Sequence, residues 1–95
     1  MNKEEFKART NKTIDLISAK LNDLKAEKAS AESDAKTEIE NKINTLENNQ
    51  NDLQSTLENL EATSEEKWND IKNSFETTLN KSENALESIK NKITA

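Results

Sequence analysis

Apolar side chains recur every three or four residues along most of the chain. The steps average about 3.6 residues, the period of a straight α-helix, and small or polar residues fill the few places without a large side chain. We call this row the seam; it comprises Ile14, Ile17, Leu21, Leu24, Lys28, Ala31, Ala35, Ile39, Ile43, Leu46, Gln50, Leu53, Leu57, Leu60, Ser64, Trp68, Ile71, Phe75, Leu79, Ser82, Leu86, Ile89 and Ile93. The pattern predicts an all-α protein whose helices each carry one apolar stripe.

The composition supports the same fold class. The 95 residues include no Gly and no Pro, the two residues that most often interrupt helices. Tight β-hairpin turns favour Gly at special backbone angles, and repeated turns of that kind would be hard to build without it. We therefore expect helices and no β-sheet.

The stretch LENNQNDLQ, residues 46–54, is the preferred place for the chain to reverse. Asn48, Asn49, Asn51 and Asp52 form helices poorly, because their side chains compete for backbone hydrogen bonds in turns. We predict one coiled-coil domain, 1–95, folded as a long antiparallel helical hairpin with a turn near 48–52 and arms 4–47 and 53–94. This fold would set the alanines of 29–35 opposite Trp68, so that small side chains face the largest one.

Two other arrangements remain open. The seam stays in phase through Gln50, as it would in one continuous helix of a coiled coil. Breaks near 30–33 and 62–64 would instead give a three-helix bundle, and Thr63 and Glu66 have the spacing of a capping box. Net charges of +2, −6 and −1 for 1–30, 31–62 and 63–95 support the bundle, because the first two segments attract each other.

The apolar content is small for a chain that folds alone. Seven Ile, nine Leu, two Phe, Trp68 and Met1 are its large apolar side chains. Chains of this kind are usually stabilised by disulfides, metals or self-association, and the sequence contains no Cys and no His. We therefore predict a homo-oligomer, a dimer or higher, with Leu16 and Phe6 as candidates for the contact between copies.

The residue types argue against an enzyme and against a cofactor or metal site. Without His and Cys, the commonest general base, every thiol nucleophile and the usual zinc ligands are missing. Two sets of glutamates have helical spacing, Glu58 with Glu61 and Glu65, and Glu83 with Glu87, and we interpret both as solvated faces. The net charge of −5 also argues against a nucleic-acid partner.

The predicted function is structural: a scaffold, spacer or helical adaptor that docks helices. The residues expected to carry packing or interaction are Trp68, Ile71, Phe75, Leu79, Ile14, Ile17, Leu21 and Leu24. The alternative is an amphipathic helix in the C-terminal third that lies on a lipid surface, although its acidic residues offset its lysines. The sequence shows neither a signal-peptide pattern nor a long apolar run, so a cytoplasmic location is expected.

The segment around Trp68, Ile71, Lys72, Phe75 and Glu76 resembles small bacterial coiled-coil proteins of the cyanobacterial stress-response type. In those proteins an Ala- and Glu/Lys-rich first half precedes a Trp-x-x-(Leu/Ile)-Lys-x-x-Phe-Glu segment. The Asn-rich centre of this chain departs from that pattern. The resemblance implies a cytoplasmic, non-enzymatic helical protein with a role in stress, and it implies no catalytic residues.

Overall fold

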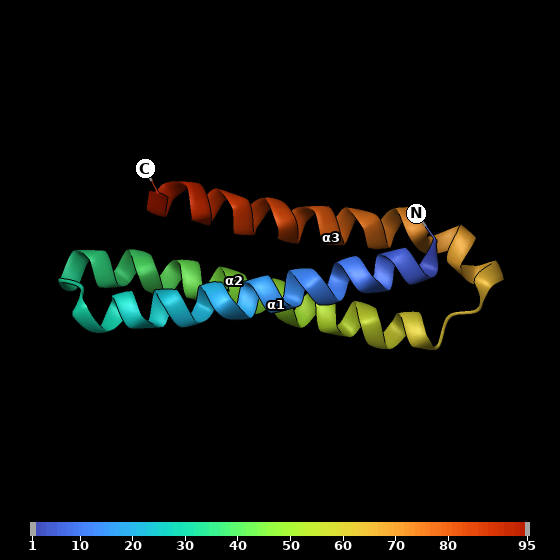
Figure 1. The fold of residues 1–95 in the computed structure, drawn as a ribbon, viewed down its shortest axis with the longest axis horizontal. Helices are drawn as coiled ribbons and strands as arrows, with labels where there is room; N and C mark the ends of the chain where they lie inside the picture. Colours follow the sequence, from blue (N-terminus) through green and yellow to red (C-terminus); the bar gives the residue numbers. More distant parts are fainter. Residues whose placement is uncertain (1, 95) are drawn as a thin grey trace.

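The computed structural model describes the backbone of residues 2–94 and the side chains of 2–89, and it consists of three long helices (Figure 1). They are α1 (Lys3–Ser30), α2 (Ser33–Glu61) and α3 (Glu65–Thr94). The chain runs along the rod, back and along it again, so α1 and α3 point the same way and α2 points the opposite way (Figure 1). The rod measures 52 × 22 × 16 Å. The all-α prediction is confirmed, and the arrangement is the three-helix alternative.

The predicted turn near 48–52 is wrong, because α2 continues without a break through the Asn-rich stretch. Leu46 and Leu53, on either side of it, are both fully buried. Between them, the Gln50 amide donates hydrogen bonds to the carbonyl of Ile14 (3.4 Å) and to Oγ of Ser18 (2.7 Å) on α1. A turn here would forfeit this burial, about 1.5–3 kcal/mol for each leucine, whereas a weak helix former costs at most about 0.7 kcal/mol. The hairpin arms 4–47 and 53–94 are therefore not formed.

The first reversal occurs at Ala31 and Glu32 instead, where the backbone is extended (ψ 152° and 166°). Alanine has the highest helix propensity of all residues, so local preference does not explain this break. The stretch 25–38 contains no large apolar side chain, however, and a connection placed there leaves no such side chain uncovered. The break therefore lies where the bundle loses least buried surface.

The second reversal, between α2 and α3, lies between two buried side chains, Leu60 and Trp68. The residue that caps α3 is Ser64, whose Oγ accepts a hydrogen bond from the backbone N–H of Lys67 (3.3 Å). The Thr63 hydroxyl donates back to the carbonyl of Asn59 (2.6 Å) and does not cap α3. The predicted capping box at Thr63 is thus one residue too early, since the serine occupies the cap position.

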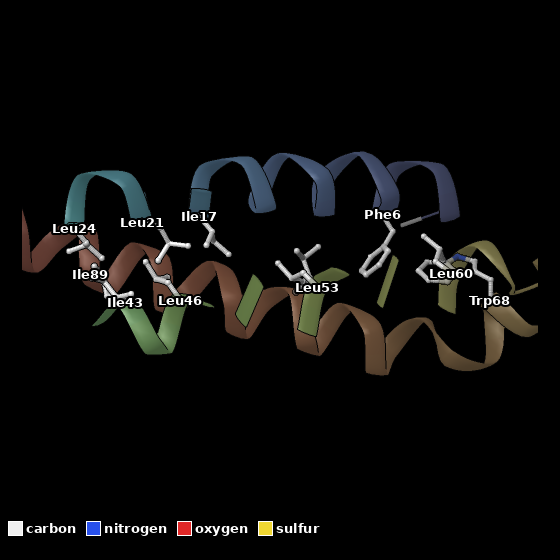
Figure 2. Close-up of a cluster of buried hydrophobic side chains, with 11 residues drawn as sticks. Phe6, Ile17, Leu21, Leu24, Ile43, Leu46, Leu53, Leu60, Trp68 and Ile89 are labelled. Atoms are coloured by element: carbon white, nitrogen blue, oxygen red, sulfur yellow. The ribbon is translucent and has the colours of Figure 1, made fainter. Parts of the chain in front are cut away.

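One hydrophobic core runs along the rod (Figure 2). Its buried members are Phe6, Ile17, Leu21, Leu24, Ile43, Leu46, Leu53, Leu60, Trp68, Leu79 and Ile89. Four small polar side chains are buried in line with them: Thr10 and Thr13 on α1, Thr56 on α2 and Ser82 on α3. The buried face of α1 therefore begins at Phe6, eight residues before the predicted seam.

Candidate interaction surface

The eight residues predicted to carry packing or interaction all lie at least half-buried in the bundle. Five of them belong to the core, namely Ile17, Leu21, Leu24, Trp68 and Leu79. Ile14 and Phe75 are partly buried against that core, and Ile71 is half-buried. These side chains hold the three helices of one chain together, and they do not form an open row onto which a further helix could dock.

Trp68 belongs to a cluster of three aromatic rings at the end of the rod where α2 meets α3. Its ring centroid lies 5.2 Å from that of Phe6 and 6.1 Å from that of Phe75, and Phe6 lies 5.9 Å from Phe75. These are the tilted geometries and separations that aromatic pairs prefer. Figure 2 shows Phe6, Leu60 and Trp68 together at this end of the core.

Two predictions for these aromatic residues are corrected. Phe6 is fully buried, so it is not an outer contact between copies. Trp68 does not face the alanines of 29–35, because the chain reverses at 31–32 and those alanines lie at the opposite end of the rod (Figure 1). What opposes the indole is instead the N-terminal turn of α1, which carries Phe6.

A polar cluster ties α1 to α3 at the surface. The Arg9 guanidinium donates from Nε to Oε2 of Glu83 (2.9 Å) and from Nη2 to Oε1 of the same carboxylate. Nη2 also donates to Oδ1 of Asn80 (3.3 Å), and Oγ1 of Thr13 lies 3.4 Å from Glu83 Oε2. The hydrogen bond to Glu83 raises the pKa of Arg9 above its ordinary value. This bidentate pairing joins α1 to α3 at the surface of the bundle.

Beside this cluster lies a shallow groove between the two helices, of about 560 Å³. We call it the α1–α3 groove; it is lined by Arg9, Lys12, Thr13, Leu16, Glu83, Asn84, Leu86 and Glu87. Leu16 is 49% exposed, and no other large hydrophobic side chain among the described ones is exposed. Leu86 packs partly buried against the core in the same groove. The predicted outer position of Leu16 agrees with the structure.

The other two interhelical grooves differ from this one. In the groove between α1 and α2, Lys28 Nζ lies 3.2 Å from Oε1 of Glu40. In the groove between α2 and α3, Lys42 Nζ lies 4.0 Å from Oε1 of Glu38. Among the described residues that line these two grooves, none is an exposed large apolar side chain. The α1–α3 groove therefore combines an exposed leucine with charges of both signs.

The glutamates with helical spacing do not gather into a site. Glu58 and Glu61 end α2, whereas Glu65 begins α3 on the other side of the connection, so these three do not share one helix face. Among the described residues, no three His, Cys, Asp or Glu side chains lie close enough to hold a metal ion. No helix in the described part of the chain is long and apolar enough to cross a bilayer.

Most of the α1–α3 groove was not predicted from the sequence, because it depends on tertiary structure. Leu16 lies off the seam and can be recognised from the sequence, whereas Glu83, Leu86 and Glu87 meet it only because α1 and α3 run parallel. No protein-family model matches this sequence, and neither a curated protein nor a solved structure matches it at a significant level. The resemblance to bacterial stress-response coiled coils therefore stays a prediction.

Proposed function

We propose that this protein is a non-enzymatic helical interaction protein that self-associates, with the three-helix rod serving as a scaffold or spacer. The observation that supports the proposal is the exposure of Leu16 over the α1–α3 groove. A single exposed leucine is common on protein surfaces. This one adjoins a second leucine, Leu86, and lies between charged side chains, some of which have no ion-pair partner among the described residues.

The energetics of the rod also favour association. Its buried face includes four hydroxyl side chains, Thr10, Thr13, Thr56 and Ser82, at places where apolar groups would contribute more to stability. A fully buried Leu contributes about 1.5–3 kcal/mol, which is large beside the 5–15 kcal/mol that stabilises a typical domain. Covering Leu16 and Leu86 on a partner would add to this margin, because mass action stabilises the form that binds.

Light scattering coupled to size exclusion tests the proposal. We expect a mass of twice 10.7 kDa or more, with the fraction of assembled chain rising with protein concentration. Leu16→Glu should shift the protein to the chain mass while circular dichroism shows unchanged helix content, because residue 16 lies outside the core. Leu16→Met, which keeps the apolar character, is the control. A mass of one chain at every concentration would contradict the proposal.

The lipid-surface alternative requires a larger change in the structure. Five of the large apolar residues on the described part of α3 belong to the core or pack against it, namely Trp68, Phe75, Leu79, Leu86 and Ile89, so α3 would have to leave the bundle before it met a bilayer. Trp68 is already 2% exposed, and its fluorescence would shift little further on lipid binding. Co-sedimentation with anionic vesicles is therefore the better measurement, and recovery of the protein with the vesicles would favour the alternative.

A further inference from the structure

We propose that the α1–α3 groove is covered by the same groove of a second copy, with the two rods side by side and parallel. In this dimer Lys12 of each copy pairs with Glu87 of the other, and the leucines at positions 16 and 86 meet between these pairs. The proposal rests on the self-association proposed above. It adds the contact surface, the relative direction of the rods and the ion pairs.

The two rims of the groove carry opposite charges. The α1 rim contributes Arg9 and Lys12, and the α3 rim contributes Glu83 and Glu87. Arg9 and Glu83 already pair with each other. Lys12 and Glu87 are exposed, and within the described part of the chain neither has an ion-pair partner. Among the described residues, the groove thus presents one cation without an ion-pair partner, Lys12, on its α1 side and one such anion, Glu87, on its α3 side.

These two charges lie at similar heights along the rod. Residues of α1 meet residues of α3 about seventy positions later: Thr13 is 70 residues from Glu83, and Arg9 is 71 from Asn80. Position 12 is therefore level with position 82, and Glu87 lies about 7 Å further along the axis. Extended Lys and Glu side chains span that offset, so a cation on one rod can reach the anion on a rod beside it.

The direction of the second rod follows from these charges. A two-fold axis parallel to the rods sets α1 of one copy against α3 of the other, so the basic rim faces the acidic rim twice. An antiparallel pair centred on Leu16 would set α1 against α1, with Lys12 near Lys20, and the acidic rim against itself. Like charges in such positions disfavour that pairing, and opposite charges favour the parallel one. Arg9, which would approach Asp23 in the antiparallel pair, is already bound to Glu83.

The centre of the parallel contact is apolar. Each copy contributes Leu16 and Leu86, so four leucines would meet between the two sets of charges. An apolar centre inside a polar, charged rim is the usual anatomy of a protein interface. The contact is small, and we expect a dimer whose population depends on concentration rather than a permanent one.

Charge reversal tests the direction of the rods. Lys12→Glu should weaken the dimer about tenfold, and Glu87→Lys by a similar factor, because each replaces two attractions with two repulsions. The double variant K12E/E87K should recover the affinity of the parent. Lys7→Glu is the matched control: it makes the same charge change on α1, about two turns before Ile14, whose carbonyl is bonded to α2. In the antiparallel pair, Lys12→Glu would tighten the dimer, which would overturn the proposal.

Disulfide trapping tests the contact directly. Because the chain contains no cysteine, only the introduced thiols can form a disulfide. Two single variants, Lys12→Cys and Glu87→Cys, are mixed with one of them carrying a mass tag. Oxidation should give the mixed 12–87 species in preference to 12–12 or 87–87. If light scattering shows a dimer but the mixed species does not form, this geometry is wrong while self-association stands. A mass of one chain at every concentration rejects both.

Discussion

Where α2 meets α3, three aromatic rings pack together, whereas the described core residues at the opposite end of the rod, where α1 meets α2, are all aliphatic (Figure 2). The two connections also differ in the hydrogen bonds that side chains make to them. At the aromatic end, the Lys3 ammonium donates to the carbonyl of Thr63 (2.6 Å) and Ser64 caps the following helix. At the aliphatic end, Glu32 occupies the cap position of α2 and makes no side-chain cap hydrogen bond.

This difference shows how a chain with few large side chains can distribute its stability. The aromatic end concentrates burial in three rings, to which the second connection and the start of α1 are anchored. The aliphatic end spreads burial over Leu21, Leu24, Ile43, Leu46 and Ile89. We therefore expect single substitutions in the core to lower stability more at the aromatic end than at the aliphatic end. At the aliphatic end, we expect a better N-cap residue in the connection to raise stability.

The largest effect is expected for Trp68→Ala. Removing a fully buried Trp costs about 3–5 kcal/mol, enough to unfold a marginal domain, and the cost should exceed that of Leu24→Ala at the aliphatic end. The free energy of unfolding from urea titrations followed by circular dichroism measures both. Trp68→Phe, which keeps a ring beside Phe6, should lose less. Equal losses for Trp68→Ala and Leu24→Ala would remove the contrast between the ends.

The second effect is a gain, expected for Thr10→Val. The hydroxyl of Thr10 is fully buried and has no hydrogen-bond partner within the described structure, a situation that costs about 1–3 kcal/mol. Valine has nearly the same shape, so we expect about 1 kcal/mol of added stability and a melting temperature higher by about 4–8 °C. Thr13→Val is the matched control, because the Thr13 hydroxyl donates to the carbonyl of Arg9 (2.9 Å) and should not give this gain.

The third prediction compares the two connections. Glu32→Asp should stabilise the protein by about 0.5–1 kcal/mol, because Asp is a favoured N-cap residue and the backbone at 32 is already extended. Ser64→Ala, at the aromatic end, should lose a similar amount, since it removes a cap that exists. Thermal melts of both variants measure the changes. A loss of stability in Glu32→Asp would show that this connection is not limited by its cap.

The smallest effect is expected at the surface pair of Arg9 and Glu83. Exposed ion pairs contribute about 0.2–1 kcal/mol, and salt screens them. Arg9→Met should therefore lower stability slightly in dilute buffer, with the difference from the parent shrinking as salt is added. Urea titrations at low and high ionic strength give both values. A large loss that does not depend on salt would mean that the Arg9 stem contributes through packing instead.

Much of the fold could be predicted from the spacing of apolar residues. The features that were missed have physical explanations. The seam correctly marked Ile17, Leu21, Leu24, Leu46 and Leu53 as inward-facing, because burial depends directly on helical period. The beginning of the buried face at Phe6 was missed because Thr10 and Thr13 continue it with polar side chains. The candidate surface was predictable only at Leu16, since its partners come from a helix far along the sequence.

The connections show the limit of local preference most clearly. The chain stays helical through Asn48, Asn49 and Asn51, and it breaks at Ala31, which is the reverse of the order of intrinsic propensity. Propensities differ by less than about 1 kcal/mol for each residue, while each buried leucine or ring contributes more. The long stretch 25–38 without a large apolar side chain was the stronger signal for the first connection.

The sequence by itself determined that this protein is helical and which side of each helix is apolar, because helical period and the absence of Gly and Pro act locally. Only the tertiary structure decided where the helices end, which rings meet around Trp68 and which charges border Leu16. Those outcomes depend on the register between helices, which is set by the total surface that three helices bury together and by no single segment.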